Sequence, residues 1–259
     1  MEFVKSPDGT RIAWTSGGNG PALVVVNGAL ADHTTTEALR HWLEPHFTVV
    51  GYDRRARGES GDTRPYTVER EVEDLAAVIE AAGSPALVYG HSSGAVLALE
   101  AAMRGLPIAK LAVSEPPYIL PGTRPMPGPE INGQLLLLSQ HGDEAAMIDL
   151  FMRELVGLPG GAVRQMEQSA QWPAMLKLAP SLRYDALLMG RFELPQTRIA
   201  SIGVKTLVLA GGASFDWIIS TARTVADLIP RAEYHVMPGQ QHNPAPHVVC
   251  SHLTGFFQP

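Results

Sequence analysis

The sequence predicts an α/β protein built on a mostly parallel sheet. Short apolar runs, typical of buried strands, recur along the chain and alternate with stretches of helical periodicity. A Gly-x-Ser-x-Gly pattern lies where one of these runs meets the next helical stretch. With 259 residues, 45% of them hydrophobic, the chain can bury a large core in one α/β domain.

The chain begins with a predicted hairpin, in which residues 2–5 and 11–15 flank the turn sequence Pro7-Asp8-Gly9. Buried strands are expected next at residues 22–26, 47–52, 86–89 and 111–113. Residues 67–82 carry apolar side chains on one face and end before Gly83. This stretch therefore predicts an amphipathic helix that packs on the sheet.

Strand signals return late in the chain, at residues 204–210 and 234–237. A helical stretch at residues 220–229 separates them, and another at residues 246–257 follows. These elements extend the alternation of strands and helices to the end of the sequence.

The pattern changes between residues 116 and 202. Its entry is irregular because of Pro121, Pro125, Pro127 and Pro129. Helical stretches without a clear strand follow at residues 132–140, 144–156, 161–168 and 172–178. We expect residues 1–115 and 203–259 to form the core of the fold. Residues 116–202 are expected to form an inserted helical cap.

Composition and charge narrow the class of protein. The formal net charge is −6, the acidic residues are dispersed, and the longest basic cluster is Arg54-Arg55, so a nucleic-acid partner is not expected. Cys250 is the single cysteine, which excludes an intrachain disulfide and fits a reducing compartment. Because residues 1–7 lack the apolar run of a signal peptide and no later segment could span a bilayer, we expect a cytoplasmic protein without membrane attachment.

Ser92 is the candidate nucleophile. It lies in the sequence Tyr89-Gly90-His91-Ser92-Ser93-Gly94-Ala95, between the strand at residues 86–89 and an Ala/Leu-rich run at residues 95–103. The glycines on either side of Ser92 allow the backbone to double back at this corner. The pattern therefore predicts a nucleophile elbow, the strand-to-helix turn that exposes a serine hydroxyl.

A serine nucleophile needs a base, and the base needs an acid to orient it. His242 is the candidate base, because it follows the last predicted strand and triads of this kind run serine, acid, histidine along the chain. The nine histidines form no metal-binding spacing, and no phosphate loop or dinucleotide fingerprint occurs. We therefore expect neither a metal nor a cofactor.

An acyl-transfer intermediate carries an oxyanion that needs at least two preorganised donors, usually backbone N–H groups. The amide of Ser93 is one candidate, since it lies at the N-terminus of the helix after the nucleophile. The amide of Ala29, in the loop Asn27-Gly28-Ala29-Leu30 after the strand at residues 22–26, is the second.

These motifs resemble the α/β-hydrolase superfamily over nearly the whole chain. The resemblance rests on the Ala29 loop, the elbow, the sequence Tyr52-Asp53-Arg54-Arg55-Ala56-Arg57-Gly58-Glu59-Ser60 and the sequence Pro238-Gly239-Gln240-Gln241-His242. It implies the α/β-hydrolase fold: a mostly parallel eight-stranded sheet flanked by helices, with a helical cap inserted after the sixth strand. It also implies that Asp53 ties its turn together and is not a catalytic group.

The acid of the triad has two candidates. Members of the superfamily usually carry it after the seventh strand, but here the corresponding position is Ser214, and Asp216 is displaced toward the next helix. Some members, including zearalenone lactonase, carry it directly after the sixth strand, where this chain has Glu115. The resemblance therefore favours Glu115, with Asp216 as the alternative.

The expected cap is rich in large apolar side chains, which suit an adaptable cavity wall: Met126, Leu135, Leu138, Met147, Phe151, Met152, Trp172, Met175, Leu187 and Met189. We expect no basic residues near the elbow, which argues against phosphate or polycarboxylate substrates.

We therefore expect a cofactor-independent serine hydrolase that cleaves a small, largely apolar ester or lactone through an acyl-enzyme. A carbon–carbon bond hydrolase or a perhydrolase would use the same triad, and a ligand-binding protein without turnover could keep the same scaffold. The sequence leaves the oligomeric state open.

Overall fold

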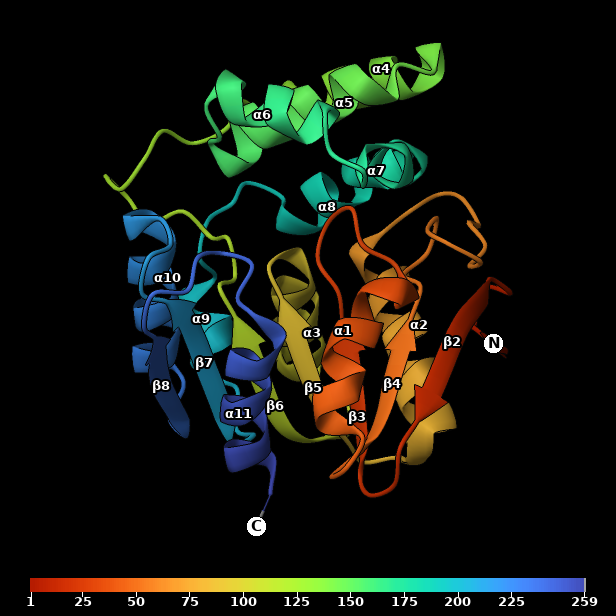
Figure 1. Ribbon diagram of the computed structural model, residues 1–259, viewed down its shortest axis with the longest axis vertical. Helices are drawn as coiled ribbons and strands as arrows, with labels where there is room; N and C mark the ends of the chain where they lie inside the picture. Colours follow the sequence, from red (N-terminus) through yellow and green to blue (C-terminus); the bar gives the residue numbers. More distant parts are fainter. Residues whose placement is uncertain (259) are drawn as a thin grey trace.

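The computed structural model describes residues 1–258, in which eight strands form one sheet of order β1-β2-β4-β3-β5-β6-β7-β8 (Figure 1). β1 (Glu2–Lys5) and β2 (Arg11–Gly17) form the expected antiparallel hairpin, and β2 also pairs antiparallel with β4 (Thr48–Tyr52). All other neighbours are parallel, and they include β3 (Ala22–Val26), β5 (Ala86–His91), β6 (Ile108–Ser114), β7 (Thr206–Gly211) and β8 (Ala232–Met237). The predicted mostly parallel sheet is confirmed.

The central strands are mostly apolar, as expected for a sheet whose two faces are both covered by helices (Figure 1). In β3, Leu23 and Val25 pack with α1 (His33–Leu43) and α11 (Pro246–Phe257) on one face. Val24 and Val26 point to the other face and join the core with α2 (Val68–Gly83), α3 (Ser93–Met103) and α10 (Asp216–Leu228). This alternation follows from the two-residue period of a strand.

The segment between β6 and β7 is helical and lies mostly over the carboxyl ends of the strands (Figure 1). Its elements are α4 (Ile131–His141), α5 (Glu144–Leu150), the π-helix Phe151–Val156, α6 (Gly160–Glu167), α7 (Trp172–Leu178), the 3₁₀ turn Ala179–Ser181, α8 (Leu182–Met189) and α9 (Gln196–Ile199). We call residues 116–202 the helical segment. α9 differs from the rest, because it packs beside the sheet against α3 and α10.

Two features of the helical segment differ from the sequence expectation. The helix predicted over residues 144–156 ends at Leu150 and continues as a π-helix, and α8 and α9 were not predicted. The Arg124 guanidinium donates hydrogen bonds to the carbonyls of Glu154, Leu155 and Val156, which lie at the end of the π-helix. Carbonyls at a helix end lack partners within the helix, so Arg124 stabilises this wider turn from outside.

Among residues 1–258, no helix combines the length and the apolar character needed to cross a membrane.

Candidate active site

Ser92 occupies a tight turn between β5 and α3. Its backbone lies in the left-handed region, with φ 54° and ψ −125°, and α3 begins at the next residue. The flanking glycines are required sterically. A Cβ on Gly94 would lie 2.1 Å from the Val26 carbonyl oxygen, and one on Gly90 would lie 2.6 Å from the Gly94 carbonyl oxygen. The sequence thus folds into the predicted elbow because only glycine fits at these two positions.

His242 lies on the loop after β8, at the same edge of the sheet as the elbow. Its Nε2 atom is 3.1 Å from Ser92 Oγ, and its Nδ1 atom is 2.5 Å from Glu115 Oε2. The loop is held by Gln240, whose side chain accepts from the Ala245 amide and whose carbonyl accepts from the Ala213 amide. A hydroxyl, an imidazole and a carboxylate are therefore aligned as a hydrogen-bonded relay.

Glu115 directly follows β6 and is completely buried. Its backbone has φ 50°, unusual for a residue other than glycine, and its carboxylate accepts three hydrogen bonds. The donors are the Gly211 amide at 2.7 Å, the Ser214 hydroxyl at 2.9 Å and the His242 ring. Burial by itself raises the pKa of a carboxyl group, but these three donors hold the pKa of Glu115 below its ordinary value. The group is therefore an anion at neutral pH.

Ser214 and the alternative acid, Asp216, lie differently from Glu115. Ser214, at the position where the resemblance leads us to expect an acid, donates its hydroxyl to Glu115. Asp216 is exposed and is the first residue of α10, where a negative charge suits the helix dipole. In the part of the chain that the structure describes, residues 1–258, Asp216 makes no hydrogen bond or ion pair with His242. The imidazole thus faces Glu115.

The loop Asn27–Leu30 packs against the elbow. Asn27 donates to the Asp32 carbonyl and to the Thr36 hydroxyl, both at 3.0 Å, which fixes the start of the loop. A Cβ on Gly28 would lie 3.1 Å from Ser92 Cβ, so the backbone approaches the nucleophile closely. Ala29 and Ser93 both border the same cavity as Ser92. The two residues expected to supply oxyanion donors therefore border the same space as the nucleophile.

His91 precedes the nucleophile, and at an elbow we expect the side chain in this position to point away from the serine, packed or partly exposed. It is partly buried, but its ring centroid lies 4.9 Å from that of His242, and its Nε2 atom is 3.3 Å from Asn243 Oδ1. Burial and the neighbouring His242 lower the pKa of His91 to about 4, so the His91 ring beside His242 is uncharged at neutral pH.

A cavity of about 760 Å³ opens over Ser92 between the sheet edge and the helical segment. Four of the ten apolar residues named from the sequence line it: Phe151, Met152, Met175 and Met189. Phe215 and Trp217, near the start of α10, add aromatic surface from the core. No Asp, Glu, Lys or Arg is among the lining residues in the part of the chain that the structure describes. The cavity therefore suits a neutral, largely apolar molecule.

Basic side chains do lie near the elbow, which corrects the sequence expectation. Arg54 Nη1 is 3.2 Å from Ser93 Oγ, and Arg57 lies beside it. Both guanidinium groups are buried and ion-paired, with Asp185 and, for Arg54, also with Glu71. They do not line the cavity. The contacts with Asp185 connect positions more than a hundred residues apart, so no local pattern in the sequence reveals them.

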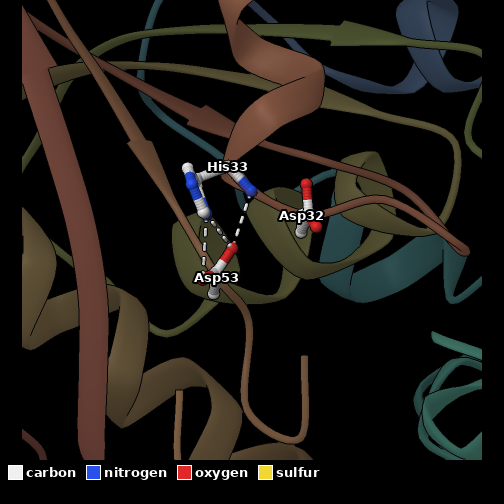
Figure 2. Close-up of side chains that lie close together, drawn as sticks. All are labelled: Asp32, His33 and Asp53. Atoms are coloured by element: carbon white, nitrogen blue, oxygen red, sulfur yellow. Dashed lines mark hydrogen bonds and ion pairs between the residues drawn. The ribbon is translucent and has the colours of Figure 1, made fainter. Parts of the chain in front are cut away.

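Asp32, His33 and Asp53 form the cluster drawn in Figure 2, with one possible ligand atom from each within 4.8 Å of the others. The Asp53 carboxylate accepts from the His33 amide and from the Glu59 amide and lies against the His33 ring. The Asp32 carboxylate accepts from the Thr34 amide as the N-cap of α1. These oxygens are thus occupied in holding the turn after β4 and the start of α1, as expected for Asp53.

A comparison with known protein families matches residues 23–252 to the alpha/beta hydrolase family. This match agrees with the fold, with the elbow and with the alignment of the serine, the histidine and the carboxylate. The chain belongs to the alpha/beta hydrolase family.

Two solved structures resemble this chain. The solved structure of an alpha/beta hydrolase from Sphaerobacter thermophilus DSM 20745 is 48% identical, with a TM-score of 0.96, and the match covers 99% of this chain and 100% of that chain. The esterase RhEst1 from Rhodococcus sp. ECU1013 is 22% identical with a TM-score of 0.71, covering 98% and 97% of the two chains, a likeness of fold alone.

The uncharacterized hydrolase YraK of Bacillus subtilis (strain 168) is 28% identical over 151 residues. The match takes in 57% of this chain and 49% of YraK, so the chain spans about half the length of that relative. The family match and the relatives named as hydrolases support the assignment of this chain as a hydrolase.

Proposed function

We propose that this protein is a serine hydrolase that cleaves a small, largely apolar carboxylic ester or lactone through an acyl-enzyme. One observation carries the proposal: Ser92 Oγ, His242 and Glu115 form a continuous relay, with distances of 3.1 and 2.5 Å, at the floor of an uncharged cavity. Glu115 is the acid of this proposed triad. Asp216 has no role in it.

In the proposed reaction, His242 Nε2 accepts the proton of Ser92 as the serine oxygen attacks the substrate carbonyl. The anionic Glu115 holds His242 Nδ1–H, which fixes the tautomer that accepts at Nε2 and stabilises the imidazolium that forms. The amides of Ala29 and Ser93 hold the oxyanion. Protonated His242 then gives its proton to the leaving alkoxide, and water attacks the acyl-enzyme by the same route.

The substrate class follows from the cavity wall. Apolar side chains of the helical segment, among them Phe151, Met152, Met175 and Met189, border the space above Ser92. Two aromatic residues near the start of α10, Phe215 and Trp217, add to this apolar surface. A substrate carboxylate or phosphate would lose its hydration there without gaining a cationic partner, which is unfavourable. We therefore propose neutral acyl groups, with the helical segment acting as the cap that encloses them.

The experiment is to label the purified protein with a fluorophosphonate, which reacts with activated serines and mimics the tetrahedral intermediate. Intact mass and peptide mapping should find one adduct on Ser92 and none in Ser92→Ala, a variant that keeps the fold. A panel of p-nitrophenyl esters and simple lactones then ranks the acyl groups.

Activity toward esters or lactones that survives in Ser92→Ala would overturn the proposed mechanism. Absence of an adduct on the folded wild-type protein would replace it with a ligand-binding role. Labelling without turnover of any ester or lactone would move the proposal to carbon–carbon cleavage or perhydrolysis, which use the same groups.

A further inference from the structure

A buried group of four charged side chains lies next to the elbow, and the proposed mechanism makes no use of it. Arg54 and Arg57 come from the turn after β4, Glu71 from α2 and Asp185 from α8 of the helical segment, and each is at most 1% exposed. Arg54 pairs with Glu71 at 2.7 Å and with Asp185 at 2.9 Å, and Arg57 pairs with Asp185 at 2.8 Å. Buried charges are unfavourable unless they are paired in this way.

Asp185 reaches one of the two proposed oxyanion donors directly. The Ser93 hydroxyl donates to Asp185 Oδ1 at 2.7 Å and accepts from Arg54 Nη1 at 3.2 Å. Ser93 is the first residue of α3, so its amide has no partner within the helix and is free to bind an oxyanion. Its side chain is thus fastened to the helical segment while its backbone borders the cavity.

The second donor is reached through Arg57. The Arg57 Nη1 atom donates to the Gly28 carbonyl at 3.4 Å, and Arg54 Nη1 donates to the preceding Asn27 carbonyl at 3.3 Å. The Gly28 carbonyl and the Ala29 amide belong to one planar trans peptide group, in which C=O and N–H point in opposite directions. Binding the carbonyl on the buried side therefore orients the Ala29 N–H away from the arginine, and the bound cation polarises the peptide group.

We propose that Asp185 is a positioning residue for the oxyanion hole, which it fixes through Ser93 on one side and through Arg57 on the other. This inference rests on the proposed function. The docking of α8 then sets the reactivity of Ser92, because the donor amides are aligned only when the helical segment holds its carboxylate between the two arginines. Burial alone would raise the pKa of Asp185, but Arg57 and Arg54 hold it below its ordinary value, so the carboxylate is charged at neutral pH.

The chain contains a matched control for this group. Arg55, the neighbour of Arg54, pairs with Asp74 at 2.7 and 2.8 Å, and both side chains are fully buried. This second pair ties the turn after β4 to α2 and to Asp8 in the hairpin turn. It has no hydrogen bond with Ser93 or with residues 27–30. Asp74→Asn therefore breaks an equally buried ion pair without touching the oxyanion hole.

The test compares Asp185→Asn with Asp74→Asn. The measurements are the rate constant for fluorophosphonate labelling of Ser92, kcat and KM for p-nitrophenyl butyrate, and the Tm of each variant. In Asp185→Asn we expect the labelling rate and kcat to fall at least about tenfold while KM stays within about twofold, because the donors act chiefly in the transition state. In Asp74→Asn we expect a lower Tm but wild-type rates.

Ser93→Ala keeps the inference testable if Asp185→Asn does not fold. It removes the hydroxyl that binds Asp185 and leaves no charge unpaired, so the labelling rate should fall severalfold with little change in Tm.

Wild-type labelling rates in Ser93→Ala and in folded Asp185→Asn would overturn the inference, and so would equal losses in Asp74→Asn and Asp185→Asn. Failure of the wild-type protein to label would instead remove the proposed function, and the inference with it.

Discussion

Replacing Glu115 with Gln should impair catalysis far more than replacing Asp216 with Asn. The Glu115 carboxylate accepts three hydrogen bonds, with Gly211 on Oε1 and with Ser214 and His242 on Oε2. A glutamine has one acceptor oxygen, so its NH₂ group must face a donor. If the NH₂ group faces Gly211, two donors oppose each other. If it faces His242, the imidazole accepts at Nδ1, and Nε2 can no longer take the Ser92 proton.

The magnitude follows from this tautomer argument. Removing the charge of the orienting acid while keeping its shape lowers kcat by about 10⁴-fold in a serine triad, and we expect about 10³–10⁴-fold here. At about 1.36 kcal/mol per factor of ten, this is about 4–5.5 kcal/mol of transition-state stabilisation. Asp216 is exposed at the start of α10, so Asp216→Asn should change kcat by less than about twofold and stability by about 0.3–1 kcal/mol.

The assay is steady-state hydrolysis of the best p-nitrophenyl ester, with circular dichroism to verify folding. The double variant Glu115→Gln with Ser214→Asp adds a rescue, because the Ser214 hydroxyl lies 2.9 Å from the oxygen that His242 contacts. A carboxylate at position 214 should regain at least about tenfold of the lost kcat. A larger loss in Asp216→Asn than in Glu115→Gln would refute the reasoning and move the acid to the loop after β7.

Three further outcomes are expected. Gly94→Ala should destabilise the fold by about 2–3 kcal/mol in urea denaturation, since its Cβ would lie 2.1 Å from the Val26 carbonyl oxygen. Gly133→Ala in α4 has open space around it and should stabilise the fold by about 0.5–1 kcal/mol. Equal effects of the two substitutions on stability would contradict the steric explanation. The pKa of Asp185 in the folded protein lies below the ordinary value of 3.8, so the stability that its charge contributes is complete above that pH and is lost as the pH falls through the folded-state pKa. The difference in Tm between wild type and Asp185→Asn should therefore shrink below about pH 4. A difference in Tm that stays constant with pH would exclude this linkage. Burial raises the pKa of the Cys250 thiol to about 12, so native protein at pH 8 should resist iodoacetamide until it is unfolded, as mass spectrometry can follow.

Local patterns in the sequence were sufficient to predict the sheet. The central strands are largely buried on both faces, so most of them appear in the sequence as short apolar runs, as in residues 22–26. The helical segment was predicted less well. α8 and α9 are short, and the carbonyls at the end of the π-helix bind Arg124, which lies outside the helix. Such contacts leave no periodic signal.

The sequence by itself determined the elbow, because Gly90 and Gly94 serve a local steric need, and it placed Ser92 and His242 at one edge of the sheet. Only the tertiary structure decided which carboxylate faces the imidazole, since Glu115 and His242 are 127 positions apart and meet through the order of β6, β7 and β8. It also decided the surroundings of Arg54, whose partner Asp185 is 131 positions away. Hydrogen bonds and ion pairs depend on distances in space, and a sequence specifies those only through the packing of the whole chain.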